Sequence, residues 1–260
     1  LNQTFTQFEL ILINDGSTDH SLELLDQYRD DRIRRIDLPP SGIVTALNEG
    51  IYSSKAPYLA RMDADDVAYA HRLEKQYEYL EKYPEVGVVA SKVNYIGDIE
   101  QNYGFFHYVE WNNQLTTPEE IRLNRFVESP VTHPSIMMRT ELVKKYGGYA
   151  EGEFPEDYEY WLRLMDQHVK IAKINEVLLD WYDDEDRLSR RHKKYSSDAF
   201  YDVKSRYFAR WFRGYFKKPP QLLVWGTGKS VLQKSAWLKK YNIEVDAYID
   251  VLDKKDRWIA

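Results

Sequence analysis

Short apolar runs alternate with amphipathic segments along the first 90 residues of the chain. Four segments predict strands: Phe8–Ile13, Ile33–Leu38, Tyr58–Met62 and Val86–Ala90. The first is a near-continuous apolar run, as expected for a strand that is covered on both faces. Between them, apolar residues three or four positions apart predict three helices. Strands that alternate with helices indicate an α/β fold with a mainly parallel sheet flanked by helices. Ligands of such sheets bind outside the carboxyl ends of the strands, so the residues after each run are the first site candidates.

The pattern is less regular after residue 95, but it still predicts further elements. We expect helices over 117–127 and from Glu156, strands over 131–138, 170–174 and 177–181, and a long helix over 199–216. Thr117 and Glu120 have the spacing of a capping box, with proline at the first helical position. The helix over 199–216 carries Arg and Lys between its aromatic residues. Packing on the main domain explains that pattern, and a basic face near a membrane is the alternative.

These patterns divide the chain into a main α/β domain (1–190), a helical linker (191–218) and a truncated Rossmann-like β-α-β unit (219–260). In the last part, Gly226 and Gly228 match the dinucleotide-binding fingerprint, but Val231 stands at its third glycine. A P-loop is excluded, because its first glycine would fall at Leu223. Asp250 lies where a ribose-binding acid would follow. We interpret the glycine turn as a strand–helix connection that does not bind NAD.

Composition excludes several classes of protein. Apolar residues make up 43% of the 260 positions, enough for a sizeable core, and the formal net charge of −6 argues against a general nucleic-acid binder. There is no cysteine, so thiolate metal sites and cysteine nucleophiles are excluded. No apolar run approaches the roughly 18 residues of a membrane span. The sequence begins with Leu1 rather than Met, so we expect an internal fragment.

Three carboxylates follow the third predicted strand within four residues, at Asp63, Asp65 and Asp66. Such crowding raises the pKa of the carboxyl groups unless a positive group lies between them, and a divalent cation is the simplest such group. The alternative is an acidic surface turn in which Asp65 or Asp66 caps the following helix. Asp15 follows the first predicted strand in the same way. We therefore expect both acidic strand ends at the same edge of one sheet, which favours a ligand site.

Five motifs in order resemble the inverting glycosyltransferases of family 2, which have the GT-A fold. The motifs are FELILINDGSTD (8–19), GIVTALNEG (42–50), YLARMDADD (58–66), HPS (133–135) and ED followed by WLR (156–163). The resemblance covers residues 1 to about 182. It implies transfer of a sugar from a UDP- or GDP-linked donor to an acceptor hydroxyl, with inversion. The acceptor would be a carbohydrate or lipid-linked, in the synthesis of bacterial cell-surface polysaccharide or glycoconjugate.

The resemblance implies a role for each matching residue at the donor. Asp15 would contact the nucleobase, and Asp63 would lie against the ribose or the metal. Asp65 would coordinate a Mn²⁺ or Mg²⁺ ion that bridges the diphosphate. Gly42 and Asn48 would shape the donor pocket, although a structural turn explains Gly42 equally well. We expect a cytoplasmic protein with peripheral contact at the inner face of the membrane.

At the acceptor, the resemblance implies that Asp157 is the general base, with Glu156 beside it. Acidic residues are also common in the first turn of a helix, where they complement its dipole, so Asp157 has a structural alternative. His133 would lie on the pyrophosphate or acceptor side, and a buried, hydrogen-bonded histidine is the alternative. The sequence does not predict the oligomeric state.

The sequence departs from the family pattern in two places. The family's first strand, which ends in a turn that holds the nucleotide, has no counterpart here, so the sheet would lack a central strand. Tyr182 and Asp183 stand where the family has Tyr-Arg followed by His. The residues that could replace this arginine and histidine are Arg187, Arg190, Arg191 and His192. Two rival functions therefore remain: a nucleotidyltransferase, and a catalytically inactive nucleotide-sugar-binding module.

Overall fold

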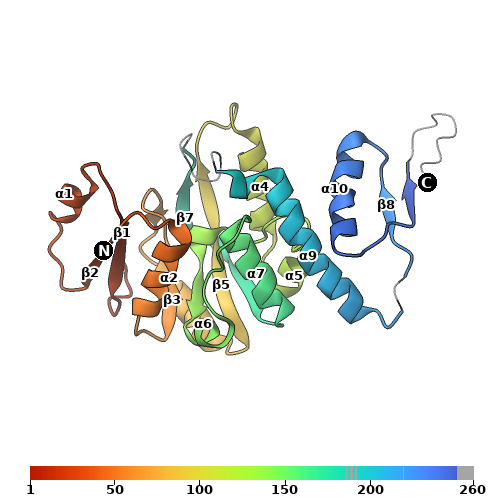
Figure 1. The fold of residues 1–260 in the computed structure, drawn as a ribbon. Helices are drawn as coiled ribbons and strands as arrows, with labels where there is room; N and C mark the ends of the chain where they lie inside the picture. Colours follow the sequence, from red (N-terminus) through yellow and green to blue (C-terminus); the bar gives the residue numbers. More distant parts are fainter. Residues whose placement is uncertain (185–186, 188–189, 191, 219, 251–260) are drawn as a thin grey trace. The chain divides into compact units, whose positions relative to one another are not determined.

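The computed structural model describes residues 1–184, 187, 190, 192–218 and 220–250 (Figure 1). The chain divides into two compact units. The first unit comprises Leu1–Glu151 and Glu156–Arg187, and the second comprises Gly152–Pro155 and Leu188–Ala260. Each unit has its own hydrophobic cluster and is described by itself.

The first unit is built on a five-stranded mixed sheet of order β3-β6-β5-β7-β4. Its strands are β3 (Tyr58–Ala60), β4 (Val67–Ala68), β5 (Val86–Ile96), β6 (Met137–Arg139) and β7 (Lys170–Tyr182). The two long strands β5 and β7 pair in parallel and form the middle of the unit (Figure 1). The other pairs, β3 with β6, β6 with β5 and β4 with β7, are antiparallel.

Helices cover both faces of this sheet. They are α2 (Ile43–Ser53), α3 (Arg72–Lys82), α4 (Tyr103–Gln114), α5 (Pro118–Asn124), α6 (Glu141–Tyr146) and α7 (Glu156–Asp166). Val88 and Met138 pack on one face with residues of α2, α6 and α7, including the fully buried Trp161. The neighbouring residues Val89 and Met137 pack on the other face with α3. The alternation of side chains along β5 and β6 thus supplies two apolar clusters, as expected of a sheet covered on both faces.

Most of the predicted elements are confirmed, with local differences. The capping box of α5 is formed, because Thr117 Oγ1 accepts the N–H of Glu120 and the Glu120 carboxylate accepts the N–H of Thr117. The strands expected over 170–174 and 177–181 form one strand, β7, and irregular pairing with β5 marks the place where they join. The strand expected over 131–138 is wrong in its first part, where the proline of His133–Ser135 lies in the 3-10 helix η1. Helix α4 was not predicted, since its polar and apolar residues show little helical periodicity.

The strand β1 (Leu10–Asp15) lies outside the large sheet. It pairs in parallel with β2 (Ile33–Leu38) in a separate two-stranded sheet, and the short helix α1 (Ser21–Leu25) connects the two strands. Asp15 and Asp63 therefore follow strands of different sheets, and the expectation of one shared sheet edge is wrong. Within the described residues no strand pairs with β1 except β2, so no backbone hydrogen bonds connect β1 to β3.

The second unit contains one long helix and a small β-α-β element. Its elements are the 3-10 helix η2 (Lys193–Tyr195), α9 (Ser197–Tyr215), β8 (Leu223–Trp225), α10 (Lys229–Lys240) and β9 (Ala247–Ile249). Strands β8 and β9 pair in parallel. Helix α9 packs on α10 through a cluster that includes Phe212, Leu238 and Ile243. Among the described residues, no helix combines the length and the apolar character needed to cross a membrane.

Candidate active site

An acidic cluster forms in the turn after β3. Carboxylate oxygens of Asp63, Asp65 and Asp66 lie within 4.8 Å of one another. Asp65 is exposed, whereas Asp66 is buried, and Asp66 Oδ1 accepts the N–H of Tyr182 at 3.0 Å. The other oxygen, Oδ2, is buried without a hydrogen-bond partner among the described residues. Because a buried carboxylate oxygen without a partner is costly, and hard cations prefer oxygen ligands, these three residues suit a Mn²⁺ or Mg²⁺ ion.

The capping alternative for these carboxylates is wrong. Helix α3 begins at Arg72, and its N-cap residue, His71, makes no side-chain capping bond. Burial, together with the charges of Asp63 and Asp65, raises the pKa of Asp66 to about 7, although the N–H of Tyr182 acts to lower it. A bound cation would favour the ionised form of this carboxyl group.

Arg61 is a positive residue that contacts the acidic cluster. Its side chain is 13% exposed, and Nη1 donates to Asp63 Oδ2 at 2.6 Å while Nη2 contacts Asp63 Oδ1. The backbone of Arg61 is also fixed, since its N–H donates to the carbonyl of Ile136 and its carbonyl accepts from Nη2 of the buried Arg72. Arg61 is not among the site residues predicted from the sequence. Its signal is a cation in an otherwise apolar strand, directly before the carboxylates.

Asp15 and Gly42 form a second polar arrangement, at the end of β1. The Asp15 carboxylate accepts the N–H of Ser41 at 2.7 Å and that of Gly42 at 2.9 Å. Gly42 has φ = 85°, a conformation that glycine adopts without strain, and it precedes the first residue of α2. The structure shows Gly42 in a turn that orients Asp15, and a role in the donor pocket stays a prediction. No hydrogen bond or ion pair within the described part of the chain joins Asp15 or Gly42 to the acidic cluster.

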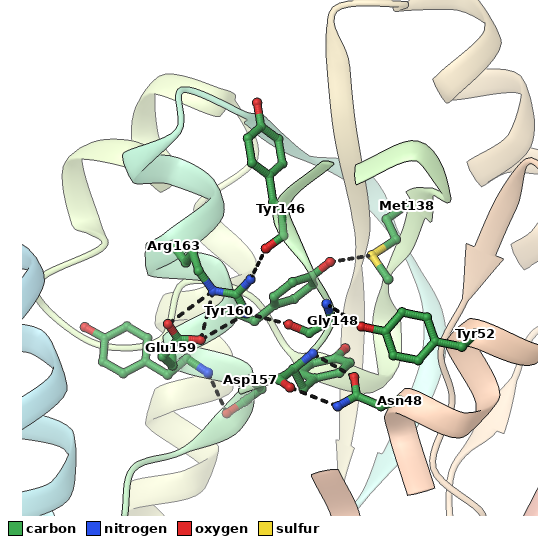
Figure 2. Close-up of polar contacts among 11 residues, drawn as sticks. Asn48, Tyr52, Met138, Tyr146, Gly148, Asp157, Glu159, Tyr160 and Arg163 are labelled. Atoms are coloured by element: carbon green, nitrogen blue, oxygen red, sulfur yellow. Dashed lines mark hydrogen bonds and ion pairs between the residues drawn. The ribbon is translucent and has the colours of Figure 1, made fainter. Parts of the chain in front are cut away.

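Asp157 occupies the second position of α7, and its neighbour Glu156 is buried. The Asp157 carboxylate accepts the N–H of Tyr158 at 2.7 Å (Figure 2). Burial and the charge of Glu156 raise the pKa of Asp157 to about 7, although the N–H of Tyr158 and the charge of Arg61 act to lower it. A carboxyl group with this pKa can accept a proton near neutral pH, which a general base requires.

His133 and Tyr149 form a buried pair beside Arg61. His133 Nε2 lies 2.6 Å from the hydroxyl of Tyr149, and the ring packs edge-on against Trp161. Burial, together with the charge of Arg61, lowers the pKa of His133 well below its usual value, so the imidazole is neutral at pH 7. The structure thus shows the buried, hydrogen-bonded arrangement of His133, and contact with a donor or acceptor stays a prediction.

Asn48 holds the backbone of Tyr149. Its Nδ2 donates to the Tyr149 carbonyl at 2.9 Å, and its Oδ1 accepts the Tyr149 N–H at 2.8 Å (Figure 2). From the other side, Arg163 of α7 donates to the carbonyls of Tyr146 and Gly148. The turn that carries Tyr149 is therefore fixed from α2 and from α7. The sequence placed Asn48 in the donor pocket, and its observed contacts are with this turn.

Arg187 lies at the end of the first unit and contacts the last two residues of β7. Its guanidinium carbon is 4.1 Å from the centroid of the Trp181 ring, and Nη1 donates to the Tyr182 carbonyl at 2.8 Å. The charge of Arg187 lowers the pKa of Asp66, so it acts on the acidic cluster. Three other residues were predicted as possible replacements for the family's arginine and histidine. Of these, Arg190 and His192 belong to the second unit, and Arg191 lies outside the described residues.

The structure thus brings one group of site residues together through Arg61. Arg61 contacts Asp63, and its charge acts on His133, Tyr149 and Asp157. The positive charge of Arg61 therefore acts both on a candidate metal ligand and on the candidate base. Such an arrangement, with an oxygen-rich cation site and a separate carboxyl group of raised pKa, suits group transfer from a phosphorylated donor.

Comparison with known proteins identifies the family. The sequence model described as Glycosyl transferase family 2 matches residues 1–147. The chain belongs to glycosyl transferase family 2. A similar curated protein is the O-antigen biosynthesis glycosyltransferase WbnJ of Escherichia coli, 29% identical over 212 residues, which are 79% of this chain and 78% of WbnJ. The prediction of the family and of the enzyme class, glycosyltransferase, is confirmed.

Solved structures of low sequence identity show the same fold. The TarS 1–349 structure from S. aureus, in complex with UDP-GlcNAc, has a TM-score of 0.61 and 16% identity, over 93% of this chain and 65% of that chain. The mannosyltransferase PcManGT of Pyrobaculum calidifontis, in complex with GDP-Man and Mn²⁺, has a TM-score of 0.54 and 15% identity, over 91% and 63% of the two chains. The family 2 glycosyltransferase chain thus spans slightly less than two thirds of these structures. The predicted GT-A fold is confirmed.

Proposed function

We propose that this chain transfers a sugar from a nucleotide diphosphate sugar to an acceptor hydroxyl, with inversion and with a divalent cation. The observation that carries the proposal is the coupling through Arg61 of two carboxyl sites, the acidic cluster and Asp157. The two sites have separate tasks. One holds charge at the departing diphosphate, and the other takes the proton of the attacking hydroxyl.

At the donor end, Asp63, Asp65 and Asp66 would hold the cation. When bound, the cation neutralises the negative charge that develops on the diphosphate as the glycosidic bond breaks. Arg187, held against Trp181, would contribute a further positive charge to the diphosphate. Asp15, oriented by the N–H groups of Ser41 and Gly42, would accept a hydrogen bond from the nucleobase.

At the acceptor end, Asp157 would take the proton of the acceptor hydroxyl as its oxygen attacks the anomeric carbon. The bond from the anomeric carbon to the diphosphate oxygen breaks, and its electron pair leaves with the nucleotide diphosphate. Attack from the face opposite the leaving group inverts the configuration. Glu156 assists by keeping the pKa of Asp157 near neutrality, while Asn48 and Arg163 fix the turn that carries Tyr149.

The acceptor would be a carbohydrate or a lipid-linked sugar, in the synthesis of a cell-surface polysaccharide. Two features support this proposal: the O-antigen name of the relative WbnJ, and the charge of residues 188–260, which include 17 Lys and Arg against 7 Asp and Glu. A basic segment attracts anionic lipids, so we propose peripheral contact with the inner face of the membrane. Sedimentation of the chain with anionic vesicles tests this contact, and a chain that stays in the supernatant would argue against it.

The function is tested with UDP-GlcNAc and GDP-Man as donors and Mn²⁺ as the cation. We expect at least one of the two donors to raise the melting temperature only when Mn²⁺ is present, because a ligand that binds the native state stabilises it. Release of UDP or GDP in the presence of a panel of saccharide and polyprenyl-linked acceptors then reports transfer. Donor binding without any transfer would favour an inactive binding module. Transfer of the donor's nucleoside monophosphate group to an acceptor, in place of the sugar, would favour a nucleotidyltransferase.

A further inference from the structure

Arg61 has an environment that differs from that of an ordinary surface arginine. Its side chain is 13% exposed, and both terminal nitrogens contact the two oxygens of Asp63. Its Nε is buried without a hydrogen-bond partner among the described residues. A desolvated cation of this kind is costly unless nearby negative charge offsets the cost, and Asp63 supplies that charge. The carboxylate of Asp63 is therefore shared: it is a candidate ligand, and it is also the counter-ion of Arg61.

This sharing changes the charge that the acidic cluster offers to a cation. Three ionised carboxylates would present three negative charges, but Arg61 cancels one of them at direct contact. The remaining carboxylates differ in accessibility, since Asp65 is exposed, whereas Asp66 is buried with one oxygen bonded to the N–H of Tyr182. A fixed positive charge at contact distance from a ligand also repels a divalent ion. The free protein is thus a poorer cation site than its three carboxylates suggest.

A nucleoside diphosphate supplies the charge that is missing. Its phosphate oxygens are hard ligands for Mn²⁺ or Mg²⁺ and carry at least two negative charges near neutral pH. We propose that Arg61 is a positioning residue that makes the cation and the nucleotide bind together, by neutralising and orienting Asp63. This inference rests on the proposed function, because it assumes that the acidic cluster is the cation site. It adds the residue that sets the order and the interdependence of binding.

The test measures Mn²⁺ affinity by titration, followed by electron paramagnetic resonance, with and without UDP or GDP. For the unchanged chain we expect Mn²⁺ to bind at least about tenfold more tightly when the nucleotide is present. Arg61→Gln removes the charge but keeps a polar side chain. In this variant we expect Mn²⁺ alone to bind about tenfold more tightly than in the unchanged chain, and the effect of the nucleotide to shrink by a similar factor. Arg61→Lys keeps the charge and should retain most of the dependence on the nucleotide.

Two controls separate this role from a structural one. Arg122→Gln removes another arginine that pairs with a carboxylate, Glu119 on α5, and should leave Mn²⁺ binding unchanged. If Arg61 acts through Asp63, then Arg61→Gln should have no further effect on Mn²⁺ binding in an Asp63→Asn background, because the two changes are coupled. Circular dichroism of each variant confirms that it is folded.

The outcomes distinguish the two proposals. Equal Mn²⁺ affinity with and without nucleotide in the unchanged chain overturns the role of Arg61, while cation binding at the acidic cluster stands. The same holds if Arg61→Gln binds Mn²⁺ no more tightly than the unchanged chain. If neither the unchanged chain nor any variant binds Mn²⁺, even with UDP or GDP present, then the metal-dependent function and the role of Arg61 are both wrong.

Discussion

The hydroxyl of Tyr149 lies 2.6 Å from Nε2 of His133, and both side chains are buried. Because burial keeps His133 neutral, the pair is a neutral hydrogen bond within the core rather than an ion pair. Tyr149→Phe leaves the imidazole nitrogen without this partner, which typically costs about 1–3 kcal/mol. We expect a loss of that size in urea unfolding. Tyr215→Phe, at an exposed tyrosine of α9, is the control, and an equal effect of both changes would contradict the importance of the pair.

Asp157→Asn should abolish sugar transfer and leave donor binding within about twofold. A positioned general base contributes about 10²–10⁴-fold to the rate, so UDP or GDP release should fall by at least the lower value. Donor affinity from calorimetry with Mn²⁺ is the accompanying measurement. Full activity of the variant would remove Asp157 as the base.

The rate of transfer should fall as the pH falls below about 7. A general base acts in its ionised form. The pKa of Asp157 is raised to about 7, so protonation would remove the proposed base below that pH. Glu156→Gln removes a negative charge that raises this pKa, and it should therefore move the fall in kcat/KM to lower pH. A profile of kcat/KM between pH 5 and 9, at saturating Mn²⁺, checks both statements. A fall in the variant at the same or higher pH would show that Glu156 does not act in this way.

Asp65→Ala should remove most of the donor binding that depends on Mn²⁺. Asp65 is the exposed member of the acidic cluster, so its replacement removes a proposed ligand without opening a cavity in the core. The measurement is the shift in melting temperature on adding donor with and without Mn²⁺. Donor binding that needs no metal and is unchanged in this variant would contradict the proposal that Asp65 holds a divalent cation. Asp98→Ala, outside the cluster, is a suitable control.

Asn48→Ala should lower the free energy of unfolding by about 1–3 kcal/mol, since the backbone N–H and carbonyl of Tyr149 lose their partners. Asn124→Ala, which removes a single side-chain bond to a backbone carbonyl on α5, should cost less. Donor affinity distinguishes the two roles of Asn48. If affinity falls beyond the effect of lower stability, the residue also shapes the donor pocket, as the sequence predicts.

The glycine turn of the second unit should not bind NAD. Thr227 Oγ1 contacts Asp250, so the acid at the ribose-binding position already has a partner within the unit. Gly226 has φ = 105° and packs near Val231, which fits a glycine required by a strand–helix connection. Calorimetry of the whole chain with NAD should show no heat of binding, and a clear signal would overturn this interpretation.

Much of the first unit could be predicted from the sequence because its signals are local. Apolar runs marked β1 and the start of β5, and the capping box of α5 was predicted correctly. Helix α4 escaped detection because its residues lack a clear apolar face, so only contacts with the sheet reveal it. The antiparallel direction of β6 was not predicted either, since direction depends on how the chain returns to the sheet.

The candidate site divides in the same way. The acidic residues were found because three carboxylates after a strand are unusual in a sequence. The roles of Arg61 and Tyr149 depend on neighbours far along the chain, such as Asp157 and His133, and spacing carries no information about them. Asn48 differs from these two residues. A sequence motif identified it as a site residue, but only the structure shows that it bonds to the backbone of Tyr149.

The separation of β1 and β2 from the large sheet has a consequence for dynamics. A two-stranded pair with few buried side chains has little to protect its amide hydrogens, so it should open without the rest of the unit unfolding. Amide exchange should therefore be fast in β1 and slow in β5. Asp15 lies at the end of β1, in this strand pair. If it contacts the nucleobase, donor binding would have to order this segment. The conformational entropy lost when β1 and β2 become ordered would then offset part of the favourable free energy of the donor contacts. The measured affinity would be weaker than those contacts alone would give.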